Sequence, residues 1–181
     1  KYAKSPEIRG NAPARRMLAV IIPAMLDLRI QQHFIDSADL HYQVAEALAK
    51  PVDAAVQAVL ACVTGGGKVL TAGMGASSAM AQYLALLLVG GFERERPGLA
   101  ACALASDGLM ASAWPDGQAL ARQVRALGQT GDVLVLISAD GEERALVEAV
   151  HAAHEREMTV MALTAQNGGA LGRQLRETDV H

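Results

Sequence analysis

The sequence has 181 residues, of which 51% are hydrophobic and only 3% aromatic, and its formal net charge at pH 7 is −3. This length and apolar content suit a folded domain with a sizeable core and exclude a disordered or fibrous chain. The charges form no basic block, so direct binding to nucleic acid is not expected. No uninterrupted apolar run reaches the about 18 residues of a membrane span, so no membrane partner is expected either.

The first residues do not resemble the rest of the chain. Two arginines precede a short apolar run at residues 17–24, which is too short for a secretory signal. We expect residues 1–24 to be an N-terminal extension or a segment foreign to the natural protein, with Met25 as a plausible natural start. Residues 25–181 are then expected to form a single domain.

The predicted elements alternate after two initial helices. Apolar residues recur with a helical period over residues 27–48 and again over 52–63, which predicts two helices separated at Pro51. The strands expected after them are residues 68–72, 100–104, 133–137 and 159–163, with the opening of a fifth at 179–181. Helices are expected at residues 78–89, 118–127, 142–157 and 170–176, with a short one after residue 108. This alternation predicts a doubly wound parallel sheet flanked by helices.

The helix expected at residues 78–89 is apolar nearly all round. Such a helix is buried on more than one side, either in the core or in a contact between subunits. We therefore expect a homo-oligomer. The two cysteines, Cys62 and Cys102, lie far apart in apolar segments and are expected to be buried free thiols in a reducing cytoplasm.

Ligands of parallel α/β sheets bind at the carboxyl ends of the strands. The loops expected there are residues 73–77, 106–108, 138–141 and 164–169. The first is a glycine-rich bend at a helix start, which suits an anion such as phosphate. Ser77 could donate to that phosphate or only cap the helix, and Asp107 could orient a sugar hydroxyl or close a turn.

No metal site is expected. His151 and His154 are three residues apart on one predicted helix and look like surface histidines without further ligands. The acidic start of this helix, Glu142 and Glu143, is explained by the helix dipole alone. No cofactor is expected.

The order of these motifs resembles the sugar isomerase (SIS) domain family. The resemblance runs from about Leu26 to His181 and is carried by GGKVL, G-x-G-x-S, FERERPGLAACAL-x-S-D, RQVRALGQTGDVLVLIS and MTVMALTAQNGGAL. More narrowly, these motifs look like the phosphoheptose isomerase branch and its non-catalytic relative, the DnaA initiator-associating protein. The resemblance implies a flavodoxin-like sheet of about five strands, N-terminal helices used in oligomerisation, a homotetramer and phosphosugar sites. It also implies that the family's last strand and C-terminal helix are missing from residues 25–181.

The resemblance also implies which residues bind substrate. Carried over by position, they are Gly73, Gly75, Ser77, Asp107 and Ser138.

Other family positions have changed. Met74 replaces a substrate-facing asparagine, Tyr83 replaces a histidine, and Leu87 replaces the glutamate that serves as the base. Leucine cannot accept a proton, so no catalytic residue is assigned. The second phosphate loop carries three carboxylates within residues 138–143, and like charge at a few ångströms from a phosphate dianion would cost about 1–4 kcal/mol at a surface-like dielectric.

We therefore expect a non-catalytic, cytoplasmic SIS-domain protein that acts by protein binding, with an altered phosphosugar pocket. A replication initiator protein is its expected partner, which would make it a regulator of DNA replication initiation. Two alternatives stay open, a sedoheptulose 7-phosphate isomerase with displaced catalytic groups and a phosphosugar sensor that binds without reacting.

Overall fold

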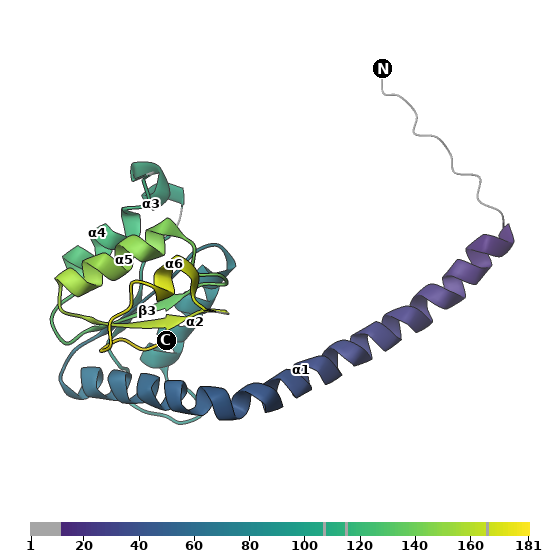
Figure 1. Ribbon diagram of the computed structural model, residues 1–181, viewed down its shortest axis with the longest axis horizontal. Coiled ribbons are helices and arrows are strands. Elements are labelled where there is room, and N and C mark those ends of the chain that lie inside the picture. Colours follow the sequence, from purple (N-terminus) through teal and green to yellow (C-terminus); the bar gives the residue numbers. More distant parts are fainter. Residues whose placement is uncertain (1–11, 107, 115, 166) are drawn as a thin grey trace, which may run out of the picture. The chain divides into compact units, whose positions relative to one another are not determined.

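The computed structural model describes residues 12–106, 108–114, 116–165 and 167–181, with side chains from residue 25 onward except those of residues 109 and 111 (Figure 1). The chain divides between Ala49 and Lys50 into two compact units. The first unit contains the N-terminal part of helix α1 (Ala12–Thr64), and the second contains the rest of α1 and the whole sheet.

Helix α1 is continuous, so the predicted break at Pro51 is wrong. Proline removes one backbone hydrogen bond, but its fixed φ is compatible with a helix, and the alanine-rich flanks favour the helical state. The stretch Met25–Thr64 is long and apolar enough to cross a membrane by length and composition alone, a test that core helices also pass. From the sequence we expected no membrane span, because we looked for an uninterrupted apolar run. The mean hydropathy of a window gives a different result because it tolerates isolated charges. Near its end, Val59 and Val63 pack against the sheet core, and Cys62 is buried in it.

Four parallel strands form the sheet in the order β2-β1-β3-β4. They are β1 (Val69–Gly73), β2 (Ala101–Ala103), β3 (Val133–Ile137) and β4 (Thr159–Leu163). This confirms the predicted parallel doubly wound α/β fold. Beyond β4, Val180 pairs with Met161 in a parallel bridge, where the fifth strand was expected to open.

In the part of the chain that the structure describes, five further helices accompany these strands. They are α2 (Ala76–Gly90), α3 (Gly108–Ala113), α4 (Ala119–Leu127), α5 (Arg144–Glu155) and α6 (Gly169–Gly172). Helix α5 begins two residues later than predicted, so Glu142 and Glu143 lie in the loop before it rather than in its first turn.

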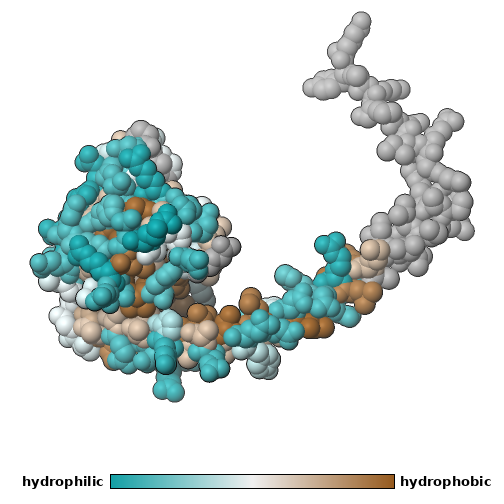
Figure 2. All heavy atoms as spheres, in the orientation of Figure 1, coloured by the Kyte–Doolittle hydropathy of each residue, from teal (hydrophilic) through white to brown (hydrophobic). Residues whose placement is uncertain are grey.

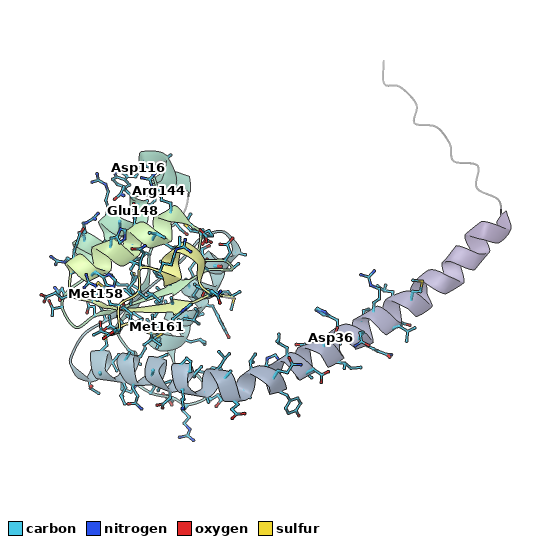
Figure 3. All side chains as sticks on the ribbon, viewed as in Figure 1. Asp36, Asp116, Arg144, Glu148, Met158 and Met161 are labelled. Carbon is cyan, nitrogen blue, oxygen red and sulfur yellow. The ribbon has the colours of Figure 1, made fainter. Side chains whose placement is uncertain are left out.

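The two faces of the sheet carry separate cores, because successive strand residues point to opposite sides. On one face, Leu134 and Leu136 join a core with side chains of α4, α5 and α6, and Figure 1 shows α4 and α5 side by side there. On the other face, Val133 and Val135 join a core with α1 and α2. Met158 and Met161, labelled in Figure 3, belong to the first and the second core respectively.

Helix α2 is not buried all round. Of the two explanations for its apolar sequence, burial in the core on more than one side is therefore wrong. Only Ala81 and Ala85 are buried, whereas Met80, Tyr83 and Leu86 are each more than half exposed. Helix α1 also exposes many large apolar residues, visible as brown spheres along it in Figure 2. A contact between subunits therefore remains the prediction for α2.

His154 is not a surface residue, contrary to the sequence expectation. Its side chain is 6% exposed, and Nε2 lies 2.7 Å from Oδ2 of Asp179, which is 1% exposed. Asp179 also accepts the backbone N–H of Val160, so the pair fastens the C-terminal segment to β4. His151 is exposed, as expected.

Burial was predicted for both cysteines and is correct for one of them. Cys62 is buried and Cys102 is exposed, and both are free thiols. Cys102 lies on β2, the edge strand of the described sheet, where one side of the strand has no neighbour.

Candidate functional site

The candidate site lies at the carboxyl ends of β1, β3 and β4. From β1 the chain continues to β2 on one side and returns to β3 on the other, so the switch point of the sheet lies between β1 and β3. Gly73, Ile137 and Leu163 are paired in register, so the loops that follow them begin side by side. In open parallel sheets, ligands bind in the crevice at this point.

The first loop turns tightly from β1 into α2. A Cβ atom on Gly73 would lie 2.5 Å from the carbonyl oxygen of Ser77, and Gly75 has a φ of 55°, so both positions favour glycine. Gly75 is the N-cap of α2, and no side chain caps this helix. Ser77 therefore does not serve as the cap. Met74 is half-buried and packs against the core on the α4–α5 face.

The hydroxyl of Ser77 is available for a ligand. Ser77 is half-buried, and its hydroxyl has no hydrogen-bond partner in the part of the chain that the structure describes. The neighbouring Ser78 differs, because its Oγ donates to the carbonyl oxygen of Gly75 at 2.7 Å. No acidic residue lies in the first turn of α2.

The second loop holds its serine internally. Ser138 is 4% exposed, and its Oγ donates to the Glu143 carboxylate at 2.5 Å and accepts the backbone N–H of Gly141 at 2.7 Å. Gly141 has a φ of 72°, and a Cβ atom there would overlap the Gly168 carbonyl group. The second loop is therefore in direct backbone contact with the third loop, which follows β4 and contains Gly168.

Further side-chain contacts lie at the same edge of the sheet. Glu142 Oε1 accepts the backbone N–H of Ala170 at 3.1 Å, and Thr164 Oγ1 lies 2.7 Å from Nε2 of His181. Asp140 Oδ1 accepts the N–H of Glu142 at 3.0 Å. The α5 side of the edge is thus rich in carboxylates, whereas the start of α2 has none.

Two positions at which the sequence departs from the resemblance, Tyr83 and Leu87, lie further along α2. Tyr83 is 52% exposed and Leu87 is half-buried, one helical turn later. Leu87 offers only its backbone carbonyl oxygen, which accepts hydrogen bonds from Gly91 and Arg96. Asp107, expected to bind substrate, lies outside the described residues.

Sequence reasoning missed the partners of the second and third loops. It interpreted Glu143 through the helix dipole and through its repulsion of a phosphate, and it gave His181 no role, whereas the structure places them on Ser138 and Thr164. The only available signal was the five-residue spacing from Ser138 to Glu143 across a glycine turn. Among the described residues, no three His, Cys, Asp or Glu side chains gather as a metal site.

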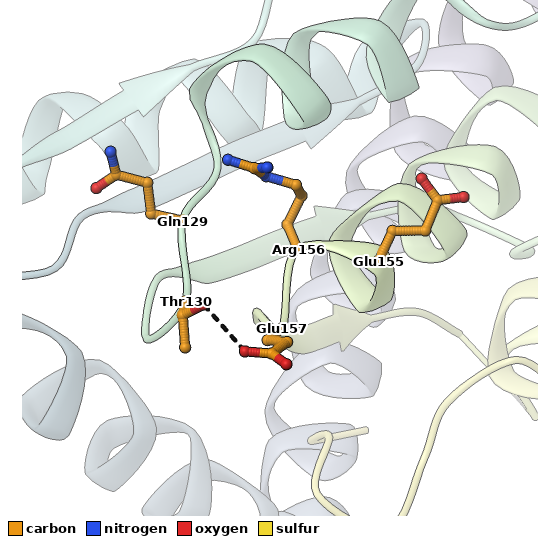
Figure 4. A pocket seen from close by; sticks show the side chains of 5 residues that line it. All are labelled: Gln129, Thr130, Glu155, Arg156 and Glu157. Atoms are coloured by element: carbon orange, nitrogen blue, oxygen red, sulfur yellow. Dashed lines mark hydrogen bonds between the residues drawn. The ribbon is translucent and has the colours of Figure 1, made fainter.

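A pocket at the opposite, amino end of the strands is a less favourable candidate. Gln129, Thr130, Glu155, Arg156 and Glu157 line it (Figure 4). Their polar groups largely bind one another or nearby groups. Thr130 Oγ1 donates to Glu157, and Arg156 Nε donates to the Gly128 carbonyl oxygen.

The pair between Arg125 and Glu155 borders the same pocket. The hydrogen bond between them lowers the pKa of Glu155 and raises that of Arg125. Both side chains are solvent-exposed, so we interpret this pair as a surface ion pair rather than part of a binding site.

Comparison with known proteins identifies the relatives of the chain. Residues 32–165 match the SIS domain family. The chain is 54% identical over 161 residues to a phosphoheptose isomerase of Methylibium petroleiphilum, covering 87% of this chain and 80% of the relative. It is 45% identical over 157 residues to a phosphoheptose isomerase of Azoarcus sp., covering 84% of this chain and 80% of the relative.

Solved structures agree. A phosphoheptose isomerase from Neisseria gonorrhoeae matches with a TM-score of 0.77 and 38% identity, covering 86% of this chain and 83% of that one. One from Francisella tularensis matches with a TM-score of 0.79 and 37% identity, at the same coverage.

These similarities contradict the expected non-catalytic, initiator-binding role, because the similar proteins named above are phosphoheptose isomerases. The expectation gave too much weight to Leu87 and Tyr83. A residue that cannot accept a proton removes one possible base, but it leaves the other ionisable groups of the edge untouched. The matched sequence, the parallel sheet and the loops at its switch point together show that the chain belongs to the SIS domain family, with phosphoheptose isomerases among its relatives.

Proposed function

We propose that this protein is a sedoheptulose 7-phosphate isomerase, an enzyme of aldose–ketose isomerisation. The observation that carries the proposal is the 54% identity to a phosphoheptose isomerase over 87% of the chain. The loops at the switch point support it, because they offer glycine backbone and a free serine hydroxyl to a phosphosugar.

In this proposal the phosphate group binds at the start of α2. Gly73 and Gly75 let the backbone approach the ligand, and the Ser77 hydroxyl donates to a phosphate oxygen. The positive end of the helix dipole at the start of α2 attracts the anion. The sugar hydroxyls then extend toward Ser138 and the carboxylates of the second loop.

The isomerisation needs a base that takes a proton from the carbon next to the carbonyl group and returns it to the neighbouring carbon. Leu87 cannot do this, so the proposal requires a base elsewhere. Asp140 and Glu142 are exposed carboxylates at the same edge. We assign the proton transfer to this pair of residues.

The enzyme is further proposed to be a cytoplasmic homo-oligomer. The apolar surface of α2 supports this, because Met80, Tyr83 and Leu86 are exposed on it. A second copy of the chain that covers this surface would remove it from water. A tetramer is the assembly that the family resemblance implies.

The decisive test is turnover of sedoheptulose 7-phosphate by the purified chain. We expect measurable isomerisation by the natural chain and a higher KM in Ser77→Ala. Asp140→Asn or Glu142→Gln, whichever removes the base, should lower kcat about 10²–10⁴-fold. Ser37→Ala is the matched control, since Ser37 is exposed on α1 and remote in sequence from the loops.

A thermal-unfolding scan with the same sugar phosphate separates binding from catalysis. A ligand at 100 times its dissociation constant should stabilise the folded state by about 2.7 kcal/mol. Stabilisation without turnover would favour a phosphosugar sensor. The isomerase proposal fails if the natural chain does not turn the substrate over.

A further inference from the structure

Glu143 lies at the start of α5. It is the N-cap residue of this helix, and its backbone carbonyl oxygen accepts the N–H groups of Leu146 and Val147. Its carboxylate makes no capping hydrogen bond to the helix. Instead the carboxylate accepts the hydroxyl of Ser138 at the end of β3.

This contact uses the hydrogen-bonding capacity that a ligand would need. A serine hydroxyl has one proton to donate, and that of Ser138 is donated to Glu143. Ser138 is 4% exposed and also accepts the N–H of Gly141, so its orientation is fixed from two sides. A phosphate oxygen could receive this proton only after the carboxylate had left.

The other charged groups of the loop do not change this picture. Asp140 accepts the N–H of Glu142, and Glu142 accepts the N–H of Ala170, so both are directed at backbone amides. The nearest cation in sequence, Arg144, lies beside Glu148 along α5, with 3.9 Å between the charged atoms (Figure 3). Glu143 is thus the carboxylate that holds the buried hydroxyl.

We propose that Glu143 is a specificity-determining residue that occupies Ser138 and keeps a phosphate dianion away from the start of α5. The phosphate end of the substrate is thereby directed to the start of α2, and the α5 side is left to uncharged sugar hydroxyls. This inference rests on the proposed function, because it concerns how the same site receives a phosphosugar.

The test is the binding of inorganic phosphate, measured by titration calorimetry on the full chain. Glu143→Gln removes the charge, and Glu143→Ala removes both the charge and the contact with Ser138. We expect both variants to bind phosphate at least about tenfold more tightly than the natural chain, a difference of about 1.4 kcal/mol. Glu148→Gln, which removes the same charge from the same helix, should not change the affinity.

Ser138 supplies the second half of the test. Adding Ser138→Ala to Glu143→Ala should remove the gain in affinity, because the freed hydroxyl is then absent. The inference is overturned if neither Glu143 variant binds phosphate more tightly, or if the gain survives without Ser138. Circular dichroism spectra that match the natural chain establish that the variants are folded.

Turnover separates this inference from the proposed function. If the natural chain does not isomerise sedoheptulose 7-phosphate, the proposed function fails, yet phosphate binding still decides the role of Glu143. If Glu143→Gln loses kcat while its phosphate affinity is unchanged, the inference is overturned, and Glu143 belongs to the chemistry instead.

Discussion

At the scale of single residues, the buried polar side chains in the described part of the chain form hydrogen bonds that hold the fold together. Asp132 is 2% exposed, and its carboxylate accepts the backbone N–H groups of Lys68 and Gln129 as well as the Lys68 ammonium at 2.6 Å. This arrangement joins the starts of β1 and β3. It explains physically why the segments GGKVL and GDVL, which carry the family resemblance, contain a lysine and an aspartate.

The two cysteines should differ in reactivity. Burial raises the pKa of the Cys62 thiol, so at any given pH a smaller share of it is the nucleophilic thiolate. Its side chain is also inaccessible, whereas Cys102 is exposed. We expect iodoacetamide at pH 8 to label Cys102 in the folded protein and Cys62 only after unfolding, as measured by peptide mass spectrometry.

The single variants provide the control for this labelling. Cys102→Ser should abolish labelling of the folded protein, and Cys62→Ser should leave it unchanged. Rapid labelling of Cys62 in the folded protein would show that α1 opens from the sheet.

At the scale of elements, helix α2 is held at its middle and at its end. The buried Thr71 hydroxyl on β1 donates to the carbonyl oxygen of Ala81, and the Arg96 guanidinium donates to the carbonyl oxygens of Leu87 and Leu88. The first turn has no such partner from a side chain. The helix is therefore fixed to the sheet while its N-terminal end remains open to a ligand.

Arg96 should be important for stability. A cation that satisfies the last carbonyl groups of a helix also interacts favourably with the helix dipole. We expect Arg96→Ala to lower the free energy of unfolding by about 1–3 kcal/mol, as measured by urea denaturation. Arg94→Ala is the matched control, because the Arg94 side chain is exposed two residues away, and its effect should stay within about 0.5 kcal/mol. Equal effects of the two variants would contradict the capping role.

At the scale of the whole molecule, the exposed apolar residues of residues 50–181 lie largely on the two helices that cover one face of the sheet. Val52, Val56 and Leu60 are exposed on α1, and Met80 and Leu86 are exposed on α2. Both helices bury other residues, such as Val59 and Leu84, against the sheet. The outer sides of these helices are therefore available to a second copy.

We expect light scattering to give a mass that is a multiple of the 18.9 kDa chain. Leu86→Glu should weaken the assembly, because it would place a charge in an apolar contact. Gln82→Glu adds the same charge at an exposed polar position of the same helix and should leave the mass unchanged. A mass equal to one chain for the natural protein would refute the oligomer.

The sequence by itself determined the class of fold, and it predicted where the site lies. The alternation of short apolar strands with helices requires a parallel sheet, and glycine at 73 and 75 marks the turn after its first strand, because these signals are local in the chain. The boundaries of β3 and β4 followed from uninterrupted apolar runs. The motifs likewise led to the correct family, although a few substituted positions led to the wrong role.

Only the tertiary structure decided the partners of individual side chains. The sequence pattern did not predict the contact between Ser138 and Glu143 or the burial of His154 against Asp179. It also did not predict that Pro51 lies inside a continuous helix. A contact depends on how the loops and helices pack in space, and the charge or polarity of a residue does not say which group it will contact. From the sequence, the carboxylate of Glu143 could equally be solvated at the start of a helix or bind the Ser138 hydroxyl. The packing of α5 against β3 selects the second arrangement.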